Sequence, residues 1–308
     1  MFRKLVLPAT LLGILCFLIG FLGKYHWLLD IFSHFRVQYL FYFLVLFTLS
    51  IVFRKRNIAI VNGVFVLLIL SSLLKFYWPN NVPQSTSSVL KIASINLLSS
   101  NHEYAQVKEF IYTAQPDVVV VLELTTTWKD QLRDLYDEYS YQHMQPQGNN
   151  FGIGMLSKIP LRNAYSVLLS EAQAPTVVAN VNLDDQLVTI IGTHPMSPGG
   201  FENYQWRNKQ LTNLGKLASQ QTNPVVLVGD LNCTSFSPNF SRLTEETKLR
   251  DSRLGYGLQP SWPAYIFPLQ IPIDHCLISE DVVVLAREMG PNVGSDHLPV
   301  IVTVGIAN

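Results

Sequence analysis

The apolar positions of the chain form three long runs near the N-terminus, at about 5–23, 37–53 and 58–76, separated by short charged segments. Each run approaches the roughly 17–25 residues that a helix needs to cross the core of a bilayer. A cleavable signal peptide is a poor fit, because two more apolar runs follow the first. The pattern therefore predicts a membrane anchor of three transmembrane helices at residues 1–77.

Beyond residue 88 the apolar runs become short and alternate with polar turns, which is typical of strands. These runs are 89–95, 117–123, 151–157, 161–169, 175–183, 186–193, 224–230, 272–278, 282–287 and 300–304. Helical spacing occurs at 103–115, 127–137 and 202–219, and a proline-bounded loop is expected after residue 230. Many short strands at close spacing favour sheet packed on sheet, with helices outside. The prediction is an α/β (α+β) domain at 89–308 behind a polar linker at 78–88.

The net charge of zero hides a division between these two parts. Residues 1–88 carry eight of the 22 Lys and Arg but only one of the 22 acids, Asp30, which leaves the outer domain with 14 basic and 21 acidic residues. An acidic domain is a poor match for a nucleic-acid backbone, which asks for clustered Lys and Arg. Duplex nucleic acid is thus disfavoured as a partner but stays open, because a bound metal offsets local negative charge.

The positions of Lys and Arg also predict an orientation. Arg3 and Lys4 precede the first span, and residues 54–56 (Arg-Lys-Arg) fill the turn between the second and third. Such clusters stay in the cytoplasm, so three crossings place the domain outside it. The segment 24–36 then faces outward, either as a helix on the membrane surface or as an ordinary loop.

Three cysteines are present, Cys16, Cys233 and Cys276, without a C-x-x-C spacing. We expect them to be unpaired and structural. Cys233 and Cys276 can pair only if the ends of their strands are adjacent, which the sequence does not decide.

Polar residues recur at the ends of the predicted strands. They are Asn96, Glu123, His194, Asp230, Asn232, Asp274, Asp296 and His297. Taken singly, most have an ordinary explanation as turn, cap or loop residues, whereas Asp274 interrupts an apolar strand and needs a partner. Together they provide oxygen ligands for a hard divalent ion, amides for phosphate oxygens and two histidines for proton transfer.

In this order the motifs resemble the endonuclease/exonuclease/phosphatase superfamily, which has the deoxyribonuclease-I-like fold. The matching residues are Asn96, Glu123, His194, Gly-Asp-Leu-Asn at 229–232, Ile-Asp-His at 273–275 and Gly-Ser-Asp-His at 294–297. The anchor is similar to that of bacterial membrane-anchored members. The resemblance implies a four-layer α/β sandwich of two packed sheets flanked by helices. It also implies phosphoester hydrolysis with Mg²⁺, and Mn²⁺ or Ca²⁺ suits the same ligands.

The resemblance also implies a role for each residue. The metal ligands would be Glu123, Asn96, Asp296 and Asp230, and the phosphate contacts Asn232, His194 and Asn96. His297 would be the general base, oriented by Asp274. Asp230 would position the attacking water, Asn232 would stabilise charge on the phosphate, and His194 would bind the phosphate or protonate the leaving oxygen.

The expected protein is a membrane-anchored phosphodiesterase or phosphatase of the bacterial inner (plasma) membrane, with its domain in the periplasm or outside the cell. Its substrate would be a lipid head group or a small phosphoester. An extracytoplasmic nuclease on DNA or RNA is the alternative. Leu98, where many nuclease members carry a polar residue, argues against it, as does the lack of a basic stripe. A catalytically silent binding domain is a further alternative, although every expected acid and histidine is present.

Overall fold

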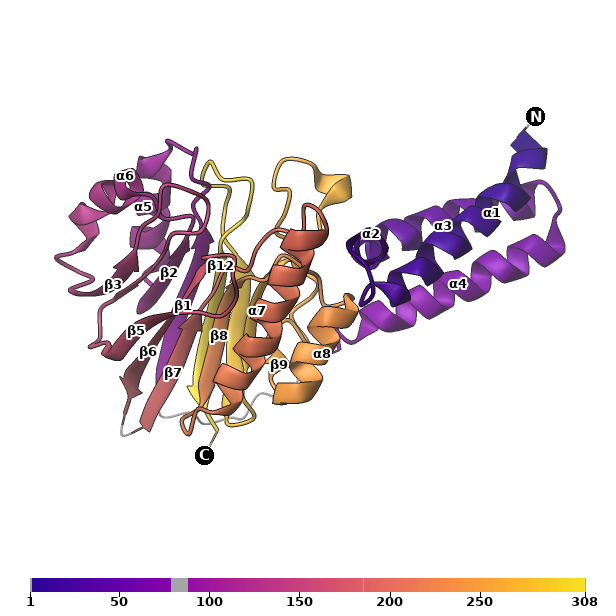
Figure 1. The fold of residues 1–308 in the computed structure, drawn as a ribbon. Coiled ribbons are helices and arrows are strands. Elements are labelled where there is room, and N and C mark those ends of the chain that lie inside the picture. The colour runs from indigo at the N-terminus through magenta and orange to yellow at the C-terminus, as the bar shows by residue number, and fades with distance from the viewer. Residues whose placement is uncertain (1, 79–87, 185, 308) are drawn as a thin grey trace.

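The computed structural model describes residues 2–78, 88–184 and 186–307. Its N-terminal part is a rod of three helices that projects from a larger sandwich (Figure 1). The helices are α1 (Phe2–Ile19), α3 (Arg36–Val52) and α4 (Arg56–Leu74). The 3-10 turn η1 (Gly20–Leu22) continues α1, and the short helix α2 (Trp27–Ile31) lies in the connection to α3, at the end of the rod nearest the sandwich.

By length and composition, two helices of the described residues can cross a membrane: Phe2–Leu22 and Arg56–Leu74. The prediction of three such helices is met only for these two. The middle run, 37–53, forms the apolar helix α3, which at 17 residues is shorter. It ends early because Arg54 takes a left-handed conformation, with φ 54°, and turns the chain into α4.

The larger part contains two six-stranded mixed sheets. The first has the order β11 (Val282–Met289), β12 (Val300–Ile306), β1 (Val89–Asn96), β2 (Val118–Leu122), β4 (Ile153–Ser157), β3 (Tyr141–Gln145). The second has the order β5 (Arg162–Leu168), β6 (Pro175–Leu183), β7 (Gln186–Gly192), β8 (Val225–Asp230), β10 (Asp274–Ile278), β9 (Arg250–Asp251). Each sheet has one parallel pair at its centre, β1 with β2 and β7 with β8. The carboxyl ends of these four strands carry much of the site described below.

The sheets pack face to face around an apolar core drawn from both, such as Ile92 and Val120 against Val188 and Val226. Helix α5 (Tyr104–Ala114), helix α6 (Thr126–Gln131) and the turn η2 (Arg133–Leu135) cover the outer face of the first sheet. Helices α7 (Phe201–Ser219) and α8 (Pro238–Thr247) cover the second. Because β2 is the sequence Val-Val-Val-Val-Leu and is buried along its whole length, it lies between two apolar layers. The predicted sandwich of packed sheets flanked by helices is confirmed.

Two local predictions were wrong. The segment after residue 230 is not only a loop, since α8 begins at Pro238 with the Ser237 hydroxyl accepting the backbone N–H of Asn239. Proline suits the first turn of a helix, where its missing N–H costs nothing. The predicted helix at 127–137 is divided into α6 and η2, and β3 and β9 were not predicted. All three cysteines are free, and Cys233 and Cys276 are buried.

The rod packs against the sandwich through the end of α4. Phe76 is buried there beside Leu258, and its ring lies 5.9 Å from that of Phe236. The backbone N–H of Gly257 donates to the Phe76 carbonyl at 2.7 Å. Most of the predicted linker, 78–88, lies outside the described residues. A short 3-10 turn, η3 (Phe267–Leu269), precedes β10.

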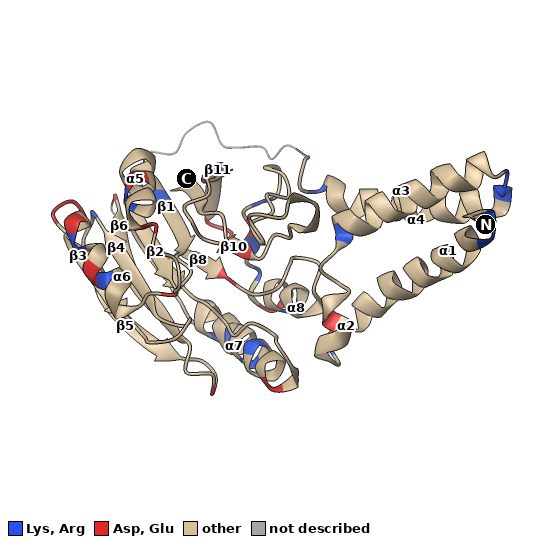
Figure 2. Ribbon diagram, turned by 90° about the horizontal axis from the view of Figure 1, so that it is seen from above, with Lys and Arg blue, Asp and Glu red and all other residues tan. Residues whose placement is uncertain are grey.

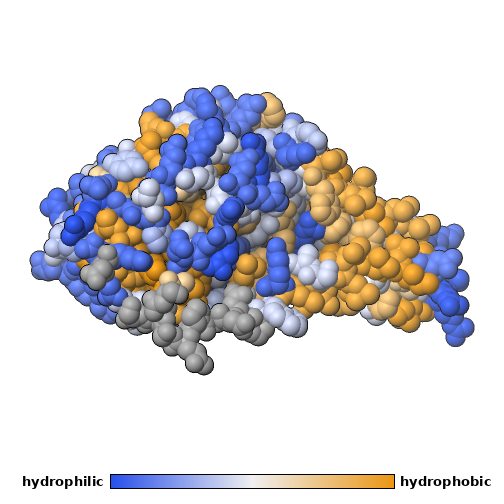
Figure 3. All heavy atoms as spheres, turned by 90° about the horizontal axis from the view of Figure 1, so that it is seen from below, coloured by the Kyte–Doolittle hydropathy of each residue, from blue (hydrophilic) through white to orange (hydrophobic). Residues whose placement is uncertain are grey.

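Charge is distributed unevenly along the rod. Basic residues gather at its far end, around the N-terminus and the turn between α3 and α4 (Figure 2). Between that end and the sandwich the rod surface is almost continuously apolar, and it includes exposed leucines of α1 and α4 (Figure 3). An apolar band with a basic tip is the pattern expected of a helical membrane anchor.

Candidate active site

The polar residues that end the central strands are held by unusual backbone conformations. Glu123 and Asn232 have φ of 58° and 50°, in the left-handed region that few non-glycine residues adopt. Gly229 has φ 146°, and a Cβ on it would lie 1.9 Å from the carbonyl oxygen of Thr193. Only glycine therefore permits β7 and β8 to approach so closely. Such conformations persist where the surrounding structure enforces them, and they are frequent at functional sites.

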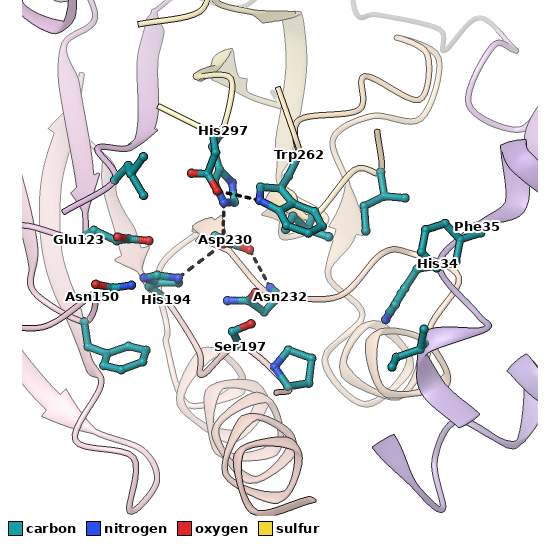
Figure 4. A pocket seen from close by; sticks show the side chains of 17 residues that line it. His34, Phe35, Glu123, Asn150, His194, Ser197, Asp230, Asn232, Trp262 and His297 are labelled. Atoms are coloured by element: carbon teal, nitrogen blue, oxygen red, sulfur yellow. Dashed lines mark hydrogen bonds and ion pairs between the residues drawn. The ribbon is translucent and has the colours of Figure 1, made fainter. Parts of the chain in front are cut away.

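These strand ends surround a pocket of about 450 Å³. Six of the eight predicted site residues line it: Glu123, His194, Asp230, Asn232, Asp296 and His297. Their side chains come from both sheets and converge from opposite sides (Figure 4). The structure thus brings together residues that are up to 174 positions apart in the chain.

Asp274 and Asn96 do not line the pocket but lie directly behind it. Asp274, in register with Asp230 across β10 and β8, bonds through Oδ2 to Nδ1 of His297 at 2.8 Å. The Oδ1 of Asn96 accepts the backbone N–H of Leu98, and Leu98 lines the pocket.

His297 lies between two carboxylates. Its Nδ1 faces Asp274, and its Nε2 lies 3.7 Å from Oδ2 of Asp230. Burial alone would lower the pKa of His297, but Asp274 and Asp230 outweigh burial and raise it to about 10. Burial likewise opposes the proton on His194, while Asp230, 3.5 Å away, raises the pKa of that histidine. Since the proton on Nδ1 is held by Asp274, Nε2 is the nitrogen of His297 that can exchange a proton near the pocket.

Several polar atoms of the site are buried without a hydrogen-bond partner among the described residues. They are Nδ2 of Asn96, Nδ1 of His194 and Oδ1 of Asp296. Unpartnered buried polar groups are rare in proteins and mark places where a ligand completes the hydrogen bonding. The Asp296 oxygen suits a cation, whereas the two nitrogens suit the oxygens of an anion.

The carboxylates fit a hard divalent ion. The Oδ2 of Asp296 accepts the Trp262 indole N–H at 2.9 Å, and the Oε2 of Glu123 accepts the backbone N–H of Ser99 at 2.9 Å. Each carboxylate is therefore oriented by a second group and retains an oxygen for a ligand, as metal-binding carboxylates do. Because the free atom of Asn96 is a donor, this residue suits the predicted phosphate contact better than the predicted metal contact.

A second acidic group, formed by Asp230, Asp274 and His297, has ligand atoms within 4.8 Å of one another. Nδ1 of His297 and Oδ2 of Asp274 already bond to each other, so these two atoms are not free to bind an ion. Only Asp230 belongs both to this group and to the predicted metal ligands.

The sequence did not predict one wall of the pocket. Ile31, at the end of α2, and His34 and Phe35, in the connection to α3, line it together with Trp262. Asp30 holds this wall in place through a buried 2.6 Å ion pair with Arg207. The available signal was that Asp30 is the single acid of the first 88 residues. A lone carboxylate in an apolar segment needs a partner, and that partner is in the sandwich.

A family model for the endonuclease/exonuclease/phosphatase family matches residues 93–297. The chain therefore belongs to this family, whose members are hydrolases of phosphate esters and nucleic acids. A search of curated protein sequences finds no significant match.

Solved structures share the fold at low sequence identity. A humanized TDP2 from D. rerio is 18% identical with a TM-score of 0.61, covering 71% of this chain and 100% of the other. An endonuclease/exonuclease/phosphatase protein from Bacteroides vulgatus is 16% identical, with a TM-score of 0.59 and coverage of 72% and 100%. A sphingomyelinase C from Streptomyces griseocarneus is 19% identical, with a TM-score of 0.51 and coverage of 72% and 100%.

Proposed function

We propose that the chain is a membrane-anchored, divalent-metal-dependent phosphoesterase that acts outside the cytoplasm. The observation that carries this proposal is the paired arrangement of His297 with Asp274 on one side and Asp230 on the other, at the base of a pocket with oriented carboxylates. A binding domain without catalysis has no need for a histidine held in this way. The members of the family to which the chain belongs are hydrolases, in agreement with this assignment.

The residues divide into three tasks. Asp274 holds His297 so that Nε2 faces the pocket, where it accepts a proton from the attacking water, and Asp230 positions that water. Asn232, Asn96 and His194 contact the phosphate, and the unpartnered Nδ1 of His194 is placed to donate to one of its oxygens or to the leaving oxygen. A divalent ion such as Mg²⁺, held by Glu123, Asp296 and Asp230 with Asn96 beside them, would neutralise phosphate charge and lower the pKa values of nearby groups.

The anchor supports the location. α1 and α4 both run from the basic tip towards the sandwich, so α3 must return the chain between them. At about 1.5 Å per residue, each of the three helices is roughly 25–29 Å long, close to a bilayer core of roughly 30 Å. We therefore propose that α3 crosses as well, which keeps the basic tip in the cytoplasm and the pocket at the outer surface of a bacterial plasma membrane.

The substrate class that fits best is a phosphoester with an apolar tail drawn from the membrane. Ile31 and Phe35 line the active-site pocket and also an apolar groove of about 340 Å³ between α1 and α3. The groove continues along the anchor past Leu12 and Cys16. We propose that an acyl chain occupies it while the phosphate reaches Asn232, because the groove opens on helices that face lipid and meets the catalytic pocket at two shared residues.

A nuclease is the second candidate, because a structural neighbour, D. rerio TDP2, has been solved with a single-stranded DNA product. The acidic balance of the outer domain favours the lipid substrate over it.

The proposal is tested with the full chain in detergent micelles, using bis-p-nitrophenyl phosphate as a soluble substrate. We expect turnover that requires Mg²⁺, is lost with a chelator and returns when the metal is restored. Glu123→Ala should raise the Mg²⁺ concentration needed for half-maximal rate. The absence of turnover, together with no Mg²⁺-dependent rise in thermal stability, would contradict the enzymatic function.

A comparison of substrates tests the groove. Cys16→Phe fills it without touching the catalytic pocket, so turnover of a long-chain phospholipid should fall several-fold relative to turnover of the soluble substrate. Leu15→Phe, on an exposed position of the same helix, is the matched control. An equal loss on both substrates in Cys16→Phe, or preferred turnover of single-stranded DNA, would contradict the lipid assignment.

A further inference from the structure

A second cavity, of about 740 Å³, lies where the anchor meets the sandwich. Its walls come from η1 and the start of α3 on one side and from residues 235–245, which include the start of α8, on the other. It shares no lining residue with the active-site pocket. Its chemistry is therefore separate from that of the phosphoesterase site.

Arg36, at the start of α3, is the most deeply buried charged residue that lines this cavity. Its side chain is largely buried, and its guanidinium carbon lies 4.5 Å and 4.8 Å from the rings of Phe17 and Phe21. Its Nε has no hydrogen-bond partner, and across residues 2–78, 88–184 and 186–307 no carboxylate pairs with it. A buried guanidinium without a counter-charge is unfavourable, so this position calls for an anion.

Other donors line the same cavity. The Nδ2 of Asn239, in the first turn of α8, is also buried and unpartnered. Lys24 adds a second positive charge, exposed at the rim. Glu245, the one acid among the lining residues, is exposed and forms no ion pair within the described parts of the chain, and Arg242 is bonded to Glu246. The cavity therefore presents an excess of unpaired donors and positive charge.

The position of the cavity indicates the source of the anion. It lies at the sandwich end of the anchor, separated from the basic tip by the length of α1 and α3. This length is roughly that of a bilayer core, so the cavity is at the level of the outer head groups. Tyr25, exposed at its rim, is a residue type enriched at that level.

We propose that this cavity binds the phosphate of an anionic phospholipid, with its acyl chains lying along the anchor. Arg36, Lys24 and Asn239 hold the phosphate through charge-assisted hydrogen bonds. The lipid then bridges the anchor and α8, so it stabilises the docking of the two parts. This inference rests on the membrane placement proposed above, but not on the catalytic assignment.

The test uses the full chain in nanodiscs of phosphatidylcholine, with and without phosphatidylglycerol at constant salt. We expect phosphatidylglycerol to raise the thermal midpoint, and native mass spectrometry to show phosphatidylglycerol retained on the protein. Arg36→Met, which keeps the length of the side chain but removes its charge, should weaken phosphatidylglycerol binding about tenfold or more. Lys55→Met removes one charge at the opposite end of the anchor and is the matched control.

Lys24→Met and Asn239→Ala serve as independent variants if Arg36→Met does not fold, and each should weaken binding where Lys55→Met does not. The proposal is wrong if phosphatidylglycerol gives no stabilisation, or if Lys55→Met loses as much binding as the cavity variants. Inorganic phosphate added to pure phosphatidylcholine nanodiscs should not reproduce the shift, and an equal shift would overturn the assignment to lipid. Failure of the chain to enter nanodiscs would show instead that the membrane placement is wrong.

Discussion

At the residue scale, His297 is the proposed general base, and two carboxylates act on its ring. Asp274 orients it through Nδ1, and Asp230 lies near Nε2 at the floor of the pocket. Together they raise the pKa of His297 to about 10 against the effect of burial. A pKa of about 10 keeps the ring protonated at neutral pH, and in the proposed mechanism bound positive charge would compete with that proton and make the ring a proton acceptor.

We expect His297→Ala to lower kcat by about 10²- to 10⁴-fold, the range that general acid–base catalysis contributes, with little loss of folding. His102→Ala, at an exposed histidine on the loop before α5, is the matched control and should retain the parent rate. The measurement is turnover of the soluble substrate beside a thermal unfolding curve. A His297→Ala protein with near-normal kcat would refute the assignment of the base.

His275 behaves in the opposite way, because it is buried neutral. Its Nε2 donates to the carbonyl oxygen of Cys233 at 2.7 Å, which leaves Nδ1 to accept from the Arg253 guanidinium at 3.0 Å. Burial, and then the Arg253 charge, lower the pKa of His275 to about 3. A proton on Nδ1 would direct an N–H at the guanidinium, so the folded state resists protonation.

The pH dependence follows from this shift. The unfolded state takes up a proton near pH 6.5 and the folded state only near pH 3, so the free energy of unfolding should fall as pH is lowered through this window. Thermal midpoints measured from pH 7 to pH 4 test the prediction. His275→Gln removes the titrating group and should flatten the slope, and an unchanged slope in that variant would assign the acid sensitivity to other groups.

At the scale of elements, α2 couples the anchor to the catalytic strand ends. Asp30, near its C-terminus, accepts from Arg207 at 2.6 Å and from Ser237 at 2.7 Å. Arg207 in turn donates to the backbone carbonyl of Asn232 at 3.0 Å. The one acid of the anchor therefore positions the guanidinium that supports the left-handed turn at Asn232.

We expect Asp30→Ala to destabilise the protein by about 3–5 kcal/mol, because it leaves Arg207 buried without its partner. In variants that fold, kcat should fall while metal dependence stays near the parent value, since Asn232 is displaced and Glu123 is not. Asp134→Ala breaks an exposed pair with Lys108 and should cost no more than about 1 kcal/mol. Equal stability losses in Asp30→Ala and Asp134→Ala would show that packing of the anchor against the sandwich does not depend on the Asp30–Arg207 ion pair.

The limits of sequence reasoning appear at the same elements. The strand ends were predictable, because Asp230 and Glu123 follow runs of buried aliphatic residues whose boundaries are sharp. The location of α8 was not predictable, because the helix is short and Pro238 at its start indicated a loop. The wall formed by Ile31, His34 and Phe35 was not predictable either, since it depends on one ion pair between residues 177 positions apart. Local patterns fix elements, whereas tertiary contacts decide which elements meet.

At the scale of the whole molecule, the proposed membrane placement would put the candidate active-site pocket beside the membrane surface. The anchor contributes one wall of that pocket, and its apolar band separates the pocket from the basic tip. A tether keeps the site close to the bilayer, which raises the effective concentration of membrane substrates at the site. The buried Asp30–Arg207 pair holds the anchor in a defined orientation on the sandwich, so under the proposed placement α2 would set how the pocket faces the bilayer.

This geometry makes a topological prediction. An alkaline phosphatase reporter fused after the last residue should be active in bacterial cells, because that enzyme matures only outside the cytoplasm and three crossings place the sandwich there. The same reporter inserted after Arg54, in the basic turn between α3 and α4, should be inactive, because Lys and Arg hold that turn in the cytoplasm. Two crossings, by α1 and α4 alone, would reverse this pattern, because the turn after α3 would then lie outside and α4 would return the chain to the cytoplasm. A reporter that is active after Arg54 and inactive after the last residue would therefore overturn the crossing of α3, and the site would then lie on the cytoplasmic face.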